Sequence, residues 1–319
     1  MTATPGAIAG KKPASRTRVQ KGLAYLNRTW MLYLMLVLPT AFFVLFRYVP
    51  MAYIWMAFSD FNIFTPVFEA EFVGLAHFRN VFSQPRFFEA VRNTLYLNIL
   101  ELILGFPAPI LLALLLNELK FRPFKRFTQT VLYMPHFLSW IVVYGMAVQL
   151  FAGNMGLVND VLARFGFGPI HFLTNTTNWV RVYIGSGIWK GAGWGTIIYL
   201  AAIAGINQEL YEAASVDGAG RFKKIINITI PCIMPTVVII LILNIGGMIG
   251  IELDRPWAFR NALVLERAEV LSTFVYQRGI LSRDHSFATA VGLFQSVVNI
   301  VLLFGANFVA KRLGERGLF

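Results

Sequence analysis

The sequence contains little charge and almost no cysteine. Charged residues make up 14% of its 319 residues, whereas a soluble globular protein carries about 25%. Hydrophobic residues make up 57%, and the mean hydropathy is +0.62, so the composition favours a polytopic membrane protein. Cys232 is the only cysteine, which excludes an intrachain disulfide and a thiolate metal cluster. We expect it to be a small, buried apolar side chain.

Motifs for catalysis and nucleotide binding are also missing. The sequence has no G-x-x-x-x-G-K-[ST] motif, so the chain does not bind ATP through a P-loop. The four histidines are scattered without the spacing of metal ligands. Hydrophilic stretches reach only about 30 residues, which is too short for an independent catalytic domain. We therefore expect no enzyme activity and no metal or cofactor bound by this chain.

The glycine-rich run GSGIWKGAGWG, residues 185–195, is superficially similar to a dinucleotide-binding fingerprint. It fails that pattern because no strand precedes it and it lies inside an apolar run. We expect its small residues to let two membrane helices approach closely.

The net charge of +12 is compatible with a nucleic-acid partner, but the distribution of the charges argues against one. The first 28 residues contain six Lys or Arg and no acidic residue, and most other positive residues lie near the ends of apolar runs. This placement is typical of topology determinants at the cytoplasmic face of a lipid membrane. We expect residues 1–28 to be a disordered basic cytoplasmic tail. A cleaved signal peptide is disfavoured because the following apolar run is longer than an h-region.

Six apolar runs are close to or above the roughly 20 residues that a membrane-spanning helix needs. They cover residues 30–58, 93–116, 128–151, 181–206, 233–251 and 286–310. The runs are continuous rather than alternating, which favours helices over a barrel. The predicted fold class is therefore an all-α membrane protein with six transmembrane helices, and residues 29–319 form its transmembrane domain.

Positively charged connections alternate along the chain with connections that are balanced or acidic. The positive ones are the N-terminal tail, loop 117–127 and the tail from residue 311, and the others are loops 59–92, 152–180 and 252–286. By the positive-inside rule, both termini and the connection 207–232 should face the cytoplasm.

Polar residues inside the apolar runs are candidates for a substrate cavity, because a charge in lipid is costly and commonly marks a water-lined path. Glu101 is the only charge in the second run, and Lys190 lies in the fourth run between Trp189 and Trp194. The full set of predicted cavity residues is Lys190, Trp189, Trp194, Glu101, Gln149 and Asn244. The alternative is a structural role, either as interhelical hydrogen bonds or as an ion pair between Glu101 and Lys190.

The stretch LYEAASVDGAGRFKKIINITIP, residues 210–231, is polar although it lies between two strongly apolar runs. Residues 209–216 are helix formers, and Gly218 and Gly220 allow a turn at positive φ. Apolar residues then recur at helical spacing behind three basic residues, which indicates a second short helix along the membrane interface. We expect a stiff protrusion on the cytoplasmic side, followed by the fifth span.

The same stretch resembles the EAA motif of permease subunits in binding-protein-dependent ABC importers, which reads E-A-A, three residues, G, nine residues, I, one residue, L-P. The matching positions are Glu212, Ala213, Ala214, Gly218, Ile228 and Pro231, and Ile230 replaces the usual leucine. Further stretches, FRYVPMAY, FPAPILLALLLNEL, MPHFLSW, GIWKGAGWGTIIYLAAIAGI and FATAVGLF, resemble the polysaccharide/lipoprotein-type permeases of carbohydrate uptake. Within that branch the chain is similar to the first permease subunits of alginate importers.

This resemblance implies a type I ABC importer permease in the bacterial inner membrane, with both termini in the cytoplasm. Its implied partners are a second homologous permease subunit, two cytoplasmic ATPase subunits that use ATP and magnesium, a solute-binding protein and a carbohydrate substrate. The implied coupling loop is 207–232. The residues that carry coupling to the ATPase are, by the same resemblance, Glu212, Ala213, Ala214, Gly218 and Pro231.

The sequence leaves two other classes of function open. A membrane-embedded enzyme acting on lipid-linked sugars would need loop 252–286, whose ELDRPWAFRN stretch is otherwise expected to be an external gate or a contact for the binding protein. A proton-driven transporter would use Glu101 as a relay, but no inverted repeat or matched pair of broken helices is evident.

Overall fold

The computed structural model describes residues 18–153, 156–250, 252–314 and 317–319. The chain divides into two units, Met1–Trp55 and Met56–Phe319, and each is described by itself.

The first unit is one helical segment with an interruption near its end. Its helix α1 (Arg18–Phe43) continues through a π-helical turn (Val44–Tyr48) into α2 (Val49–Met51) and the first residues of a 3₁₀ helix (Ala52–Phe58), which ends in the second unit. The expected tail to residue 28 is therefore helical from Arg18 onward, and its first 17 residues lie outside the described part. Arg47 lies in the π turn and Pro50 opens α2, as expected where a proline removes a backbone donor.

The second unit is helical throughout its described residues, apart from loops and one isolated bridge between Ser59 and Phe72. Its α-helices as far as the one that contains the 185–195 run are α3 (Ala76–Ser83), α4 (Pro85–Gly105), α5 (Pro107–Glu118), α6 (Arg122–Tyr133), α7 (Trp140–Phe151), α8 (Leu157–Arg164) and α9 (Thr176–Ala204). The later ones are α10 (Gln208–Val216), α11 (Arg221–Lys224), α12 (Ile230–Gly246), α13 (Asp254–Phe259), α14 (Leu265–Ala268), α15 (Leu271–Tyr276) and α16 (His285–Arg312).

Four of the predicted spans coincide with helices that are long and apolar enough to cross a membrane. Among the described residues these helices are Arg28–Phe58, Pro85–Glu118, Arg221–Gly246 and His285–Arg312. The third predicted span is a pair of helices, Arg122–Phe137 and Trp140–Phe151, bent by 104° at the break between them. The fourth corresponds to α9, which spans about 43 Å at 1.5 Å per residue but has a lower hydropathy because of Lys190 and its glycines. A span count of six therefore remains a prediction.

The break in the third predicted span follows from its local sequence. A 3₁₀ turn (Met134–Phe137) carries Pro135, which cannot donate a backbone hydrogen bond. The chain then restarts as α7, whose N-cap Ser139 accepts a hydrogen bond from the Val142 N–H at 3.4 Å.

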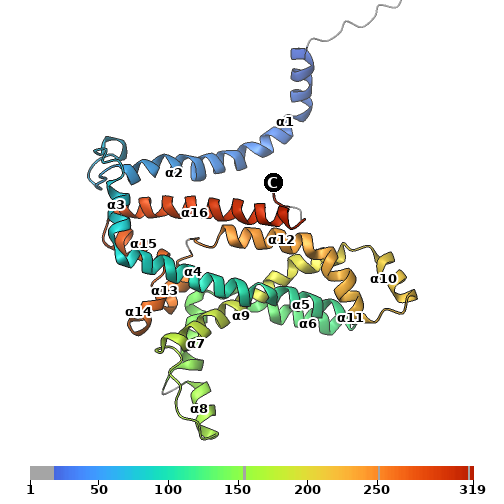
Figure 1. The fold of residues 1–319 in the computed structure, drawn as a ribbon. Helices are drawn as coiled ribbons and strands as arrows, with labels where there is room; N and C mark the ends of the chain where they lie inside the picture. The colour runs from blue at the N-terminus through green and yellow to red at the C-terminus, as the bar shows by residue number, and fades with distance from the viewer. Residues whose placement is uncertain (1–17, 154–155, 251, 315–316) are drawn as a thin grey trace, which may run out of the picture. The chain divides into compact units, whose positions relative to one another are not determined.

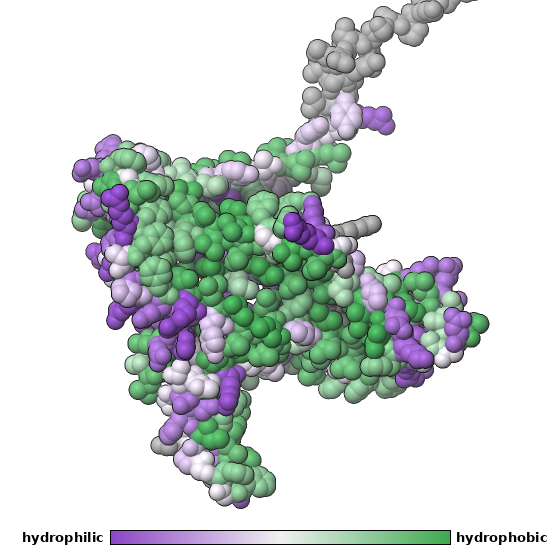
Figure 2. Space-filling view, in the orientation of Figure 1, coloured by the Kyte–Doolittle hydropathy of each residue, from purple (hydrophilic) through white to green (hydrophobic). Residues whose placement is uncertain are grey.

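Figure 1 shows that the second unit places α10, the connection between α5 and α6, and the C-terminal end of α16 toward one end of the bundle. The helices α3, α13 and α14 lie toward the other end. In Figure 2 hydrophilic residues gather at these two ends, and the surface between them is mostly hydrophobic. The sidedness of the loops and the direction of the chain across a membrane stay predictions.

Three apolar clusters hold the second unit together. One joins α4, α7, α9 and α13 around Trp179 and Phe259, and another joins α4, α15 and α16 around Phe87 and Phe287. The third joins α5, α9 and α12 around Tyr199. All three clusters include α4, α5 or α9, so these helices form the centre of the unit and position the cavity described next.

Candidate substrate cavity and coupling segment

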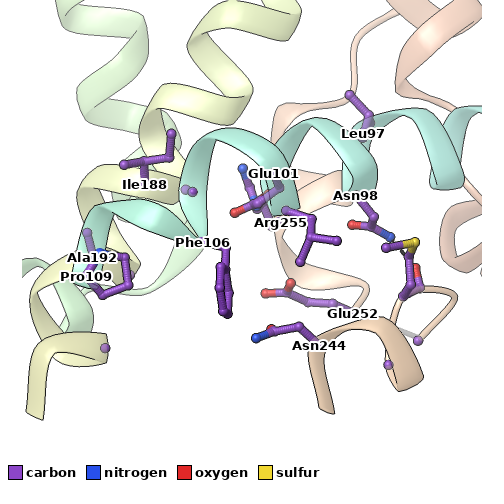
Figure 3. A pocket seen from close by; sticks show the side chains of 18 of the residues that line it. Leu97, Asn98, Glu101, Phe106, Pro109, Ile188, Ala192, Asn244, Glu252 and Arg255 are labelled. Atoms are coloured by element: carbon purple, nitrogen blue, oxygen red, sulfur yellow. Dashed lines mark hydrogen bonds and ion pairs between the residues drawn. The ribbon is translucent and has the colours of Figure 1, made fainter. Parts of the chain in front are cut away.

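A cavity of about 410 Å³ lies between α4, α5, α9, α12 and the residues from Gly247 to Ser272. Its volume is within the roughly 300–1,000 Å³ of small-molecule sites. Figure 3 shows polar side chains on its wall, among them Glu101, Glu252 and Asn244. Apolar and glycine surfaces from α5 and α9 complete the lining.

The ion pair between Glu101 and Arg255 joins two distant parts of the chain at the cavity wall. Arg255 Nη1 lies 2.5 Å from Glu101 Oε2, and Arg255 Nη2 donates to the Tyr183 carbonyl at 2.6 Å. The guanidinium also lies 3.9 Å from the centroid of the Tyr183 ring and 4.8 Å from that of Trp140. Arg255 is only 4% exposed, and its buried charge is compensated by the Glu101 carboxylate and further stabilised by the two aromatic faces.

Gly187 makes this ion pair possible. A Cβ at Gly187 would collide with Arg255 Nη2 and with Glu101 Oε1. Because glycine has no side chain, α9 can approach the paired charges closely. The glycine therefore belongs to the packing of the cavity wall.

Other polar groups of the cavity have partners far away in sequence. Glu252 Oε1 accepts a hydrogen bond from Trp140 Nε1 at 2.8 Å. Asn98 donates from its side-chain amide to the Met248 carbonyl. Asn244 Nδ2 donates to the Ile240 carbonyl within its own helix at 2.9 Å, which leaves its amide oxygen free to accept from a ligand.

The predicted cavity residues divide into two groups. Glu101 and Asn244 line the cavity. Lys190, Trp189, Trp194 and Gln149 are not part of its wall. The alternative pairing of Glu101 with Lys190 is wrong, because Glu101 pairs with Arg255.

Lys190 lies beside the break between α6 and α7. Its ammonium donates to the His136 carbonyl at 2.7 Å and lies 5.1 Å from the centroid of the Trp140 ring. The His136 ring stacks on Trp194 at 4.5 Å with an interplanar angle of 4°, and Phe137 meets Trp194 edge-on at 5.7 Å. Trp140 thus contacts both Lys190 and Arg255, and it links this group to the cavity wall.

The glycines of the 185–195 run act in helix packing. A Cβ at Gly193 would collide with the backbone carbonyl of Leu132 in α6, and a Cβ at Gly195 would lie 2.9 Å from Pro109 in α5. The expectation that these small residues allow close approach of helices is confirmed for Gly193 and Gly195, whereas a Cβ at Gly185 or Gly191 would meet no atom within 4 Å.

The 207–232 segment begins with α10, whose residues are exposed except for the half-buried Tyr211 and Ala214. Asn207 caps the helix by accepting a hydrogen bond from the Glu209 N–H, and none of the α10 residues is buried. Tyr211 Oη contacts Thr229 Oγ1 at 2.9 Å, and Lys224 Nζ contacts Ser215 Oγ at 2.5 Å. These contacts fasten α10 to the helix that follows it.

The turn after α10 has the predicted glycine geometry. Gly218 has φ +74°, and the Ala219 N–H donates to the Ala214 carbonyl at 2.8 Å, which closes the end of the helix. The structure places Glu212, Ala213 and Gly218 on the exposed surface, with Ala214 half-buried.

Two expectations about the end of this segment are wrong. The second short helix is not separate, because α11, a π turn (Ile225–Thr229) and α12 form one helix from Arg221 to Gly246. Pro231 is tolerated because it stands in the first turn of α12, directly after the π turn. Cys232 is exposed instead of buried, because its neighbour Ile233 takes the core-facing position on α12.

Sequence reasoning did not select Arg255 and Trp140. Arg255 was part of a loop expected to be external, yet Phe259, which ends the same short helix, is fully buried. The only sequence signal was the mixture of charged and aromatic residues in ELDRPWAFRN. Among the described residues, no group of three or more His, Cys, Asp or Glu could hold a metal ion.

Residues 105–315 match the family described as binding-protein-dependent transport system inner membrane component. The protein LplB of Bacillus subtilis is 40% identical over 97% of this chain and 98% of its own length. The polygalacturonan/rhamnogalacturonan transport system permease protein YteP of the same organism is 44% identical over 90% of each chain.

A solved structure of a bacterial alginate ABC transporter, in complex with alginate pentasaccharide-bound periplasmic protein, contains a similar chain. The two chains are 37% identical and superpose with a TM-score of 0.84. The match covers 95% of this chain and 100% of the chain in the solved structure. The chain therefore belongs to the family of binding-protein-dependent transport system inner membrane components, with the type I permease fold of a multi-pass membrane protein.

Proposed function

We propose that this chain is the translocation subunit of an ATP-driven importer for an oligo- or polysaccharide, with alginate as the first substrate to test. The observation that carries the substrate class is the similarity, over nearly the whole chain, to a permease of an alginate transporter and to a polygalacturonan permease. Alginate and polygalacturonan are both built from uronic acids, and rhamnogalacturonan, which the same name includes, contains uronic acid units as well. Substrate delivery would come from a solute-binding protein outside the membrane.

The cavity offers the chemistry that a saccharide requires. Sugar hydroxyls both donate and accept hydrogen bonds, and the wall carries the carboxylates of Glu101 and Glu252 and the amides of Asn98 and Asn244. We propose Glu101 and Asn244 as direct contacts. Lys190, Trp189, Trp194 and Gln149 remain proposed contacts that would require the substrate to extend beyond this cavity.

We further propose that α10 couples the permease to a separate ATPase subunit. Coupling requires an element whose contacts differ between two global states. The helix α10 is capped by Asn207 and held to the following helix by the contact of Tyr211 with Thr229. It protrudes from the bundle (Figure 1) and exposes Glu212 and Ala213. Gly218 sets the turn, and Pro231 lies in the first turn of α12 in the helix that follows.

ATP and magnesium would be bound by two partner ATPase subunits, and a second homologous permease would complete the pathway. The observation in favour of this division is that the chain has no P-loop motif of its own.

The experiment that tests this function uses the assembled complex in lipid vesicles, with both permeases, the ATPase subunits and the binding protein. We expect ATP hydrolysis to be stimulated by binding protein loaded with an alginate oligosaccharide, and the oligosaccharide to accumulate only with ATP. Accumulation without ATP, or hydrolysis that no loaded binding protein changes, would exclude the proposal.

A further inference from the structure

Lys190 is a cation whose charge is not neutralised within the described part of the chain. It lies near the middle of α9, in a predicted membrane-spanning helix. The ion pairs among the described residues join Arg255 to Glu101 and Arg278 to Asp284, and neither includes Lys190. An ammonium in such a position is costly unless it serves a ligand, a partner or a water-lined path.

The hydrogen bond of Lys190 accounts for only part of its capacity. An ammonium has three N–H donors, and one of them donates to the His136 carbonyl at 2.7 Å. That carbonyl belongs to the 3₁₀ turn at the break before α7, so this bond supports the bend. The bond fixes the position of the ammonium but leaves donors for an anion.

The two carboxylates of the cavity wall bond to groups other than Lys190. Glu101 is paired with Arg255, and Glu252 accepts the hydrogen bond of Trp140 Nε1. Lys190 and Arg255 both lie over the Trp140 ring, at 5.1 and 4.8 Å from its centroid. Both cations therefore interact with the π-system of this one indole. No carboxylate of the described residues forms an ion pair with Lys190.

Aromatic side chains next to the ammonium provide a surface for a sugar ring. His136, Phe137 and Trp194 contact one another, and Phe137 and Trp194 are 74% and 43% exposed. Binding sites for small molecules combine such apolar surfaces with a few placed polar groups. A uronate unit has the matching chemistry, because its ring has apolar C–H faces and carries a carboxylate.

We propose that the Lys190 ammonium binds a carboxylate of the transported saccharide, so that this chain selects uronate saccharides over neutral ones. The proposal rests on the proposed saccharide import. It assigns to Lys190 the recognition of charge, and to the aromatic group of His136, Phe137 and Trp194 the contact with the ring.

The test compares uptake of an alginate oligosaccharide with uptake of its carboxyl-reduced, neutral counterpart by the assembled complex. Lys190→Gln keeps an N–H donor for the His136 carbonyl but removes the charge, and Lys190→Arg keeps both. We expect Lys190→Gln to raise the apparent KM for the uronate about tenfold or more, as for the loss of a charged hydrogen bond. The KM for the neutral saccharide should stay within about twofold, and Lys190→Arg should retain most of the preference.

Arg181→Gln is the matched control, because it removes one positive charge from the same helix. Arg181 is exposed, and its guanidinium donates to the Asn178 side chain one turn earlier. We expect it to leave the ratio of the two KM values unchanged. If Lys190→Gln takes up the uronate as the wild type does, the carboxylate role is excluded while import stands. If the wild-type complex takes up neither saccharide, both the proposed function and this inference are wrong.

Discussion

The 207–232 segment and the cavity wall are both polar regions among apolar helices, but they satisfy their polar groups differently. In the 207–232 segment the partners lie close in sequence, as for Asn207 with Glu209 and for Ser215 with Lys224. In the cavity wall they lie far apart, since Glu101 and Arg255 are 154 positions from each other. The first region is held together by contacts between residues that are close in sequence. The second exists only when the whole second unit is packed.

The comparison predicts that substitutions in the packed region cost stability, whereas substitutions in the 207–232 segment cost transport. Four substitutions test this contrast, and their expected effects on stability decrease from Gly193 to Glu212.

Gly193→Val should have the largest effect on stability. The new side chain would collide with the Leu132 carbonyl where α6 crosses α9, and overpacking of this kind costs about 3 kcal/mol or more. Thermal unfolding of the purified chain in detergent measures the loss. The matched control is Gly191→Val, since a Cβ at Gly191 meets no atom within 4 Å. Equal stability of the two variants would contradict the assigned crossing.

Arg255→Met should destabilise the chain by about 3 kcal/mol, because it leaves Glu101 without its partner. In a double-mutant cycle, adding Glu101→Gln should restore a large part of the loss. The half-buried pair of Arg278 and Asp284, 3.9 Å apart, is the control, and its coupling energy in the same kind of cycle should be less than about 1 kcal/mol. Additive effects of the Arg255 and Glu101 substitutions would show that the two groups do not interact.

Gly218→Ala should have a small effect on stability and a larger one on transport. Its φ of +74° costs an alanine about 1–2 kcal/mol, so the turn after α10 should change shape. We expect uptake by the assembled complex to fall at least severalfold while the melting temperature changes by a few degrees. Gly220→Ala is the control because Gly220 has φ −70°, and it should transport normally.

Glu212→Ala should leave stability within about 0.5 kcal/mol of the wild type, since the side chain is exposed. We expect loss of ATP-dependent uptake with normal membrane insertion. Gln208→Ala, at the start of the same helix, serves as the control. Normal uptake by the Glu212 variant would remove this residue from the coupling role.

The contrast also explains which features could be predicted from the sequence. The short helix predicted over residues 209–216, its glycine turn and four of the six apolar spans depend on residues close together in sequence, and these were predicted correctly. The separate interfacial helix after the turn was not, because a π turn allows Pro231 to follow without a break.

The sequence predicted some residues of the cavity wall but not their interaction partners. Glu101, Asn244 and Lys190 are visible as polar residues in apolar runs, and two of them line the cavity. Their partners are not visible, since the choice of Arg255 over Lys190 as the partner of Glu101 depends on how α13 packs against α9. The aromatic faces of Trp140 and Tyr183, together with the space at Gly187, decide that choice.

The role of α10 can be tested most directly by cross-linking in a chain that carries Cys232→Ser to remove its only cysteine. A cysteine introduced by Ala213→Cys on exposed α10, paired with single cysteines on the ATPase subunit, should form a disulfide that stops uptake and is reversed by reductant. Val161→Cys on α8, at an exposed position in a different part of the unit, should form none. Failure of Ala213→Cys to cross-link to any ATPase position, in a complex that imports its saccharide, would contradict the coupling role of α10.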